Sequence, residues 1–128
     1  MKFAGSVLLV DDEPHIRQFV GLILKGLGVQ TMFEAENGED AVAAFQREKP
    51  DVVLLDVNMP LMNGLEALRQ IKQLDPGCVA IMLTSLANRD TVDEAIALGA
   101  AGYIRKDTPK EEIAGDLAET IDACFAAD

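Results

Sequence analysis

Cysteine, histidine and aromatic residues are scarce in this chain. Its 128 residues include 2 cysteines, 1 histidine, 1 tyrosine and no tryptophan. Cys78 and Cys124 each lie in an apolar segment with no second cysteine or histidine close by in the sequence. We therefore expect two buried free thiols, and neither a disulfide nor a zinc site.

Basic residues are also few, and long apolar runs are absent. The chain has 11 lysines and arginines against 22 acidic residues, a net charge of -11. This balance argues against nucleic acid or an anionic membrane as a direct partner, and it leaves room for a divalent cation. No apolar stretch is long enough to span a bilayer, and residues 1–5 are too short for a signal peptide. We expect a cytoplasmic protein with one domain over residues 1–128.

Apolar strands alternate with amphipathic helices along the whole chain. Strands are predicted at residues 6–10, 29–35, 52–55, 78–83 and 101–105. Helices are predicted at 16–27, 37–49, 64–74, 88–98 and 109–124, the last one opening on a capping box, Thr108-Pro109-Lys110-Glu111. Such alternation predicts an α/β fold, a parallel sheet with helices on both faces. Ligands of these folds bind at the carboxyl ends of the strands.

Three carboxylates follow two of the predicted strands. Asp11 and Asp12 come directly after the first strand, and Asp56 comes directly after the third. Like charges at close range repel, so such a cluster usually needs a cation or a proton. An oxygen-only set suits magnesium. Asp56 could be a further ligand, a base, or a nucleophile that takes up a phosphoryl group as an aspartyl phosphate.

Thr84 and Lys106 stand at the ends of the fourth and fifth predicted strands. Phosphoryl transfer depends on in-line positioning and on positive charge around the phosphoryl oxygens. Lys106 could supply that charge, and the Thr84 hydroxyl could donate a hydrogen bond. Each residue alone has a plainer interpretation, as a helix cap, a turn residue or a solvated lysine, and His15 reads as exposed and inert. Their joint occurrence at strand ends favours the functional interpretation.

Together these residues closely resemble the receiver domain of bacterial two-component response regulators, over essentially the whole chain. Asp11-Asp12 matches the acidic pair of that family. The segment from Asp56 to Gly64, with Met59-Pro60 between, matches its phosphoacceptor segment. Thr84 matches its hydroxyl residue, Lys106 its lysine and Tyr103 its switch aromatic. The resemblance implies a flavodoxin-like, doubly wound sheet of five parallel strands in the order 2-1-3-4-5, with five helices in three layers.

The resemblance further implies a signalling switch rather than a turnover enzyme. Asp56 would accept phosphate from a histidine kinase, a phosphotransfer protein or a small acyl phosphate, assisted by Lys106 and Thr84. Magnesium would bind Asp12, Asp56 and the main-chain carbonyl of Asn58 directly, and Asp11 through water. Thr84 and Tyr103 would then move. Their movement would change the face formed by the fourth helix, fifth strand and fifth helix, which would control a partner or output domain and could form a homodimer.

Two positions depart from the family pattern. Asp107 rather than proline follows Lys106. A cis bond there would cost ~3 kcal/mol without proline, so we expect a trans peptide unless the site is a strained exception. Leu86 stands where some relatives carry a polar or acidic residue. Leu86 and Asn58 would flank the path of the hydrolytic water. Because an apolar side chain cannot orient water, the sequence predicts slow loss of the phosphoryl group.

Three other functions are less well matched by the residues. A phosphatase of the haloacid dehalogenase type would need an acid where Asn58 stands, and also a cap domain or long insertions. A flavodoxin-like electron carrier would need a glycine- and hydroxyl-rich loop after the first strand, where Asp11-Asp12-Glu13-Pro14 stands. A pseudo-receiver would normally have a degraded site. The sequence leaves open a free-standing receiver or one cut from a longer regulator.

Overall fold

The computed structural model describes residues 3–85 and 88–125, and over these residues strands and helices alternate strictly. The strands are β1 Ser6–Val10, β2 Thr31–Ala35, β3 Val52–Leu55, β4 Val79–Thr84 and β5 Gly102–Arg105. The helices are α1 Pro14–Gly26, α2 Gly38–Glu48, α3 Gly64–Leu74, α4 Arg89–Ala97 and α5 Lys110–Cys124. All the strands pair in parallel, in the order β2-β1-β3-β4-β5. The predicted fold class and strand order are confirmed.

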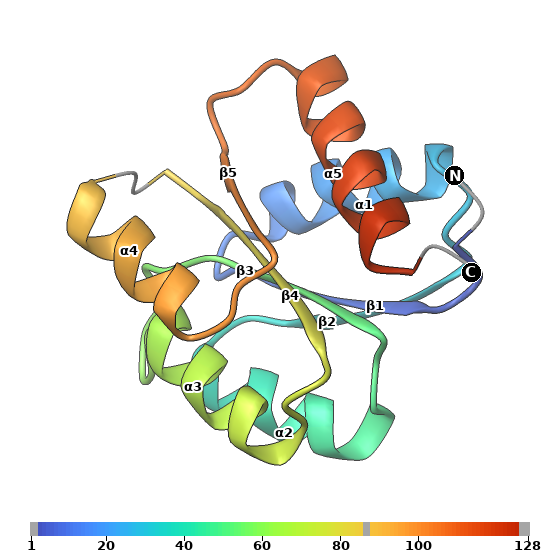
Figure 1. Ribbon diagram of the computed structural model, residues 1–128. Helices are drawn as coiled ribbons and strands as arrows, with labels where there is room; N and C mark the ends of the chain where they lie inside the picture. Colours follow the sequence, from blue (N-terminus) through green and yellow to red (C-terminus); the bar gives the residue numbers. More distant parts are fainter. Residues whose placement is uncertain (1–2, 86–87, 126–128) are drawn as a thin grey trace.

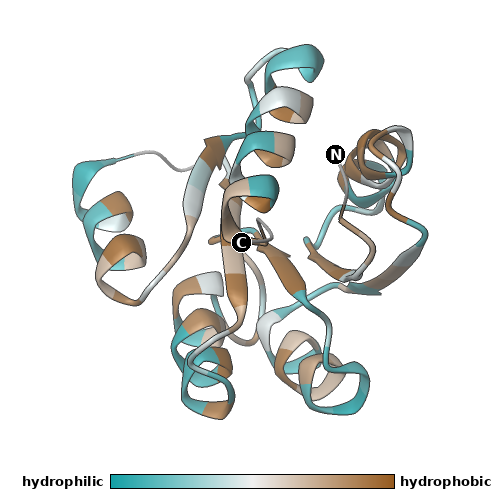
Figure 2. Ribbon diagram, turned by 45° about the vertical axis from the view of Figure 1, so that its right-hand side comes forward, coloured by the Kyte–Doolittle hydropathy of each residue, from teal (hydrophilic) through white to brown (hydrophobic). Residues whose placement is uncertain are grey.

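The sheet lies between two layers of helices (Figure 1). Helices α1 and α5 cover one face, and α2, α3 and α4 cover the other. Side chains of β1 alternate between the two cores, so Val7 and Leu9 face α1 and α5 while Leu8 and Val10 face the opposite layer. Burial on both faces explains why the inner strands are unbroken apolar runs. The helices turn their hydrophobic sides to the sheet and their hydrophilic sides outward (Figure 2).

The order of the strands reverses next to β1. This strand pairs with β2 on one side and with β3 on the other. The chain therefore leaves the carboxyl ends of β1 and β3 toward opposite layers, and in folds of this kind ligands bind at such a point. The predicted acidic residues stand at this edge of the sheet.

Asparagine side chains fix where three of the helices begin. Asn37, Asn63 and Asn88 each accept a hydrogen bond from the main-chain N–H three residues later, at the N-termini of α2, α3 and α4. The capping box predicted for the last helix is wrong. Pro109 is the N-cap itself, and its carbonyl accepts from the N–H groups of Glu112 and Ile113 without a side-chain cap.

Other differences from the sequence prediction are local. The second strand begins at Thr31, not Val29, because the Val29 N–H bonds back to Leu24 at the end of α1. Both cysteines are free, but only Cys78 is buried. The prediction for Cys124 is wrong, because the buried line of α5 ends at Ile121. Burial raises the pKa of the Cys78 thiol. No described peptide bond is cis, including the one before Asp107.

Within residues 3–85 and 88–125, no helix combines the length and the apolar character that crossing a membrane requires.

Candidate functional site

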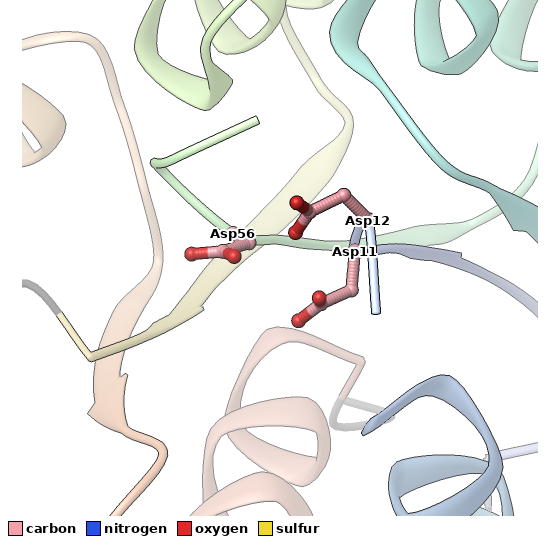
Figure 3. A group of neighbouring side chains, drawn as sticks. All are labelled: Asp11, Asp12 and Asp56. Carbon is pink, nitrogen blue, oxygen red and sulfur yellow. The ribbon is translucent and has the colours of Figure 1, made fainter. Parts of the chain in front are cut away.

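Three carboxylates meet at the edge of the sheet where β1 and β3 end. Val10 and Leu55 are partners in the register of these strands, so the residues that follow them are neighbours. Carboxylate oxygens of Asp11, Asp12 and Asp56 lie within 4.8 Å of one another. Figure 3 shows Asp12 pointing toward Asp56. Asp11 and Asp56 are 5% and 3% exposed, whereas Asp12 is exposed. Two of the three acids are thus buried, and the third is exposed to solvent.

Lys106 reaches this cluster from the end of β5. Its Nζ lies 2.6 Å from Oδ2 of Asp11 and 2.8 Å from Oδ2 of Asp56. The main-chain N–H of Lys106 donates to the carbonyl of Thr84, which holds the base of the side chain in place. Burial lowers the pKa of Lys106, but the bonds to the two carboxylates outweigh this and raise it. The ammonium therefore stays charged in the site.

Asp11 has every polar atom engaged. Its N–H donates to the carbonyl of Ala35, and its Oδ1 accepts from the N–H of Glu13. Oδ2 pairs with Lys106, and the main-chain carbonyl accepts from Nη1 of Arg17. The pKa of the Asp11 carboxyl is raised, mainly by burial and also by the charge of Asp56, although the bonds from Lys106 and the Glu13 N–H act to lower it. Asp11 is thus a fixed part of the site, with little freedom to turn toward a new partner.

The loop after β3 packs closely against the backbone of Asp56. The Gly64 N–H donates to the carbonyl of Val57 at 2.8 Å, and a Cβ at position 64 would collide with the Asp56 carbonyl. Glycine is therefore required here. In the same loop the Met62 N–H donates to the Pro60 carbonyl at 2.8 Å, and Leu61 between them has φ 69°. This is a three-residue turn of the rare, strained kind.

The other predicted site residues surround the cluster. Thr84 is fully buried at the end of β4, and Tyr103 is partly buried on the neighbouring strand β5. Burial, and then the negative charge of Asp56, raise the pKa of the Tyr103 phenol. Asn58 is exposed in the loop after β3. Leu86 lies outside the described residues.

The donor set suits a hard divalent cation. Only oxygen ligands are offered, and they carry more negative charge than the single ammonium of Lys106 balances. Oδ1 of Asp56 is buried and has no hydrogen-bond partner within the described part of the chain. A buried carboxylate oxygen without a partner is costly unless something binds it. The residues present therefore fit magnesium.

Two residues near the site were not identified from the sequence. Glu13 lies 3.8 Å from Nζ of Lys106, and Arg17 bonds the carbonyl of Asp11. A weak signal existed for Arg17, because it shares the helical phase of Val20 and Leu24, which are buried. A charged residue at a position whose helical neighbours are buried must find a polar partner inside. Glu13 carried no such signal.

Comparison with known proteins shows one consistent likeness. A profile of the response regulator receiver domain matches residues 7–118. The chain is 36% identical over 120 residues to the chemotaxis protein CheY of Halobacterium salinarum, covering 94% of this chain and 99% of that protein. It is 42% identical over 114 residues to protein-glutamate methylesterase/protein-glutamine glutaminase 1 of Paramagnetospirillum magneticum, covering 87% of this chain but only 30% of that protein.

A solved structure has the same fold. This is the CheX–CheY–BeF3–Mg2+ complex from Borrelia burgdorferi, which aligns with a TM-score of 0.86 at 26% identity. The alignment covers 95% of this chain and 90% of that one.

Proposed function

We propose that this chain, which belongs to the response regulator receiver domain family of signalling switches, accepts a phosphoryl group on Asp56. The observation that carries the proposal is the state of the Asp56 carboxylate. One oxygen pairs with Lys106 at 2.8 Å, and the other is buried beside two further acids with no hydrogen-bond partner among the described residues. A salt bridge made only for stability would not need the extra carboxylates, which repel Asp56.

In the reaction, a carboxylate oxygen of Asp56 attacks the phosphorus of a phosphohistidine or an acyl phosphate. The new O–P bond forms as the P–N or P–O bond of the donor breaks, and the leaving group keeps the electron pair. Lys106 is already within 2.8 Å of Asp56, so its ammonium can pair with the phosphoryl oxygens as they arrive. Thr84, at the end of the adjacent strand, would donate its hydroxyl to the same group. Catalysis here is positioning and charge, which is what phosphoryl transfer requires.

Asp12, Asp56 and the main-chain carbonyl of Asn58 would hold magnesium, with Asp11 acting through water. When bound, the ion neutralises part of the charge on the phosphoryl oxygens. The unpaired Oδ1 of Asp56 supports this assignment. The CheY of Borrelia burgdorferi, similar to this chain, was solved with Mg2+ and BeF3.

The phosphoryl group would act on an equilibrium between two states of the domain. It adds a dianion next to Lys106, and it would draw the Thr84 hydroxyl toward itself while Tyr103 turns inward behind it. These residues lie on β4 and β5, so the change would reach the face of α4, β5 and α5. We assign this face to a downstream partner, an output domain or a second copy of the chain. A histidine kinase or phosphotransfer protein would supply the phosphate to this chain, a single domain over residues 1–128 that we place in the cytoplasm.

The test is direct labelling with a small acyl phosphate in the presence of magnesium. The wild-type protein should gain the mass of one base-labile phosphoryl group, and peptide mapping should place it on Asp56. Asp56→Asn removes the nucleophile at nearly constant shape and should not label at that position. A wild-type protein that stays unmodified, while a known receiver in the same tube is labelled, rules the proposal out.

A further inference from the structure

We infer that Arg17 is a positioning residue for the magnesium site, because it fixes the peptide that joins Asp11 to Asp12. The inference rests on the proposed function. Arg17 lies on α1 with its side chain only 14% exposed. Its Nη1 donates to the main-chain carbonyl of Asp11 at 2.6 Å, and its Nε donates to Oε1 of Glu34 at 2.8 Å. One guanidinium therefore ties α1 and β2 to the segment that leaves β1.

The carbonyl of Asp11 is the group whose direction decides where Asp12 lies. A peptide unit is rigid and planar, so fixing the carbonyl oxygen of Asp11 also fixes the nitrogen and Cα of Asp12. The Asp11 N–H, at the other end of the residue, is fixed by the carbonyl of Ala35. Asp12 itself is exposed, so the backbone beneath it must set its position. A direct metal ligand on an exposed side chain depends on such support from residues that do not touch the metal.

The second bond of Arg17 holds the guanidinium at the correct angle. The fork of Arg17 presents two N–H groups in fixed geometry, one to Asp11 and one to Glu34. Lysine offers one flexible ammonium at that place and cannot reproduce both contacts. Glu34 is 58% exposed on the edge strand β2 and has no place in the proposed reaction. Its carboxylate keeps the fork oriented and offsets the charge of Arg17.

A positioning role for Arg17 and its positive charge predict opposite changes in Mg2+ affinity when the residue is replaced. A positive charge near a cation site repels the cation, so on electrostatic grounds alone removing it should tighten magnesium binding. If Arg17 positions Asp12, removing it should weaken binding. Losing a residue that orients a metal ligand typically costs about 10-fold or more in affinity. The sign of the change therefore distinguishes the two roles.

The experiment measures Mg2+ affinity by isothermal titration calorimetry on the full chain and three variants. Arg17→Met keeps the length of the side chain and loses both hydrogen bonds, and Arg17→Lys keeps the charge and loses the fork. The matched control is Arg47→Met, because Arg47 borders the same groove between β2 and α2 but, within residues 3–85 and 88–125, forms an ion pair with Glu48 alone and is 67% exposed. We expect both Arg17 variants to bind Mg2+ about 10-fold more weakly, and Arg47→Met to bind as tightly as wild type or slightly more tightly.

A second readout separates positioning from general stability. The rate of labelling by an acyl phosphate is followed against Mg2+ concentration. In Arg17→Lys the half-saturating concentration should rise while the rate at saturating Mg2+ stays close to wild type. If Arg17 only stabilised the fold, its replacement would lower the melting temperature in EDTA and leave the half-saturating Mg2+ concentration unchanged. Magnesium affinity in the Arg17 variants equal to or above that of wild type overturns the inference. A wild-type protein that binds no Mg2+ overturns the proposed function as well.

Discussion

In the proposed site Asp12 would bind the divalent cation and the ammonium of Lys106 would repel it, so replacing these two residues should have different effects on Mg2+ affinity. Asp12→Ala takes away an exposed carboxylate that the proposal makes a direct ligand. We expect Mg2+ affinity to fall by at least about 10-fold. Lys106→Ala removes a repelling charge and should leave Mg2+ affinity unchanged or raise it, while the phosphorylation rate falls because the phosphoryl oxygens lose their counter-charge. Calorimetric Mg2+ titration and labelling kinetics measure the two quantities. Equal loss of Mg2+ affinity in both variants would contradict these roles.

The strained backbone of Leu61 makes a prediction about the stability of the protein. Leucine at the centre of this turn, with φ 69°, is strained by about 1–3 kcal/mol relative to glycine, which has no Cβ. The side chain is 75% exposed, so little packing is lost on replacement. We expect Leu61→Gly to stabilise the protein by about 1 kcal/mol, because the strain relieved exceeds the extra conformational entropy that glycine gives the unfolded chain. Urea unfolding measures the change.

The matched control for Leu61 is Leu74→Gly. Leu74 is 49% exposed at the end of α3, where the backbone is helical. The same change of side chain there should give no gain in the free energy of unfolding. A loss of stability in Leu61→Gly would mean that the leucine makes contacts that outweigh the strain of its backbone.

How much of the site could be predicted differs from residue to residue. Asp11, Asp12 and Asp56 were placed correctly because parallel strands bring their carboxyl ends to one edge, and apolar runs show where those strands end. The bonds from Lys106 to Asp11 and from Arg17 to the Asp11 carbonyl were not predicted. Such contacts depend on side-chain direction and loop path, which hydrophobic periodicity does not report.

At the scale of helices and strands, the pattern predicted every element, and the errors lie at the ends. Pro109 ended up outside α5 because its extended backbone, with ψ 145°, makes it the N-cap rather than the first helical residue. Thr108 instead bonds through its N–H to the Arg105 carbonyl. Helix ends of this kind shift by one or two residues with the local backbone geometry, which hydrophobic periodicity does not report.

Two glycines in helices provide a paired prediction at this scale. Gly115 is exposed in the middle of α5, and a Cβ there would meet no atom within 4 Å. Gly115→Ala should stabilise the protein by about 1 kcal/mol because alanine has the higher helix propensity. Gly64 is the first residue of α3, where a Cβ would strike the carbonyl of Asp56. Gly64→Ala should destabilise by about 1–3 kcal/mol.

Chemical denaturation measures both glycine variants, and acyl phosphate labelling adds a functional readout. Gly64→Ala must move the backbone of Asp56, so its labelling should slow, whereas Gly115→Ala should label at the wild-type rate. Similar stabilities for the two variants would show that the loop after β3 can relax away from α3 at little cost.

At the scale of the whole molecule, cations should change the free energy of unfolding in two ways, one through the net charge of -11 and one through the carboxylate site. Any salt screens the general repulsion among acids. Magnesium should add a specific stabilisation, because in the proposed function it would bind the folded site and not the separated carboxylates of the unfolded chain. At a concentration 100 times its dissociation constant, a ligand adds about 2.7 kcal/mol. For a domain of this size that corresponds to a rise of about 10 °C in melting temperature.

The measurement compares melting in MgCl2 with melting in NaCl of equal ionic strength, so that general screening is the same in both. The difference between the two salts is the specific effect, and it should vanish in Asp12→Ala. In MgCl2 the wild type should therefore melt at the higher temperature, and in EDTA Asp12→Ala should. Without the cation, Asp12→Ala removes one of three mutually repelling carboxylates within 4.8 Å. If Asp12→Ala is less stable than wild type in both salts and in EDTA, Asp12 stabilises the fold itself. Equal melting of wild type in the two salts would mean that the whole magnesium response comes from screening of the negative surface.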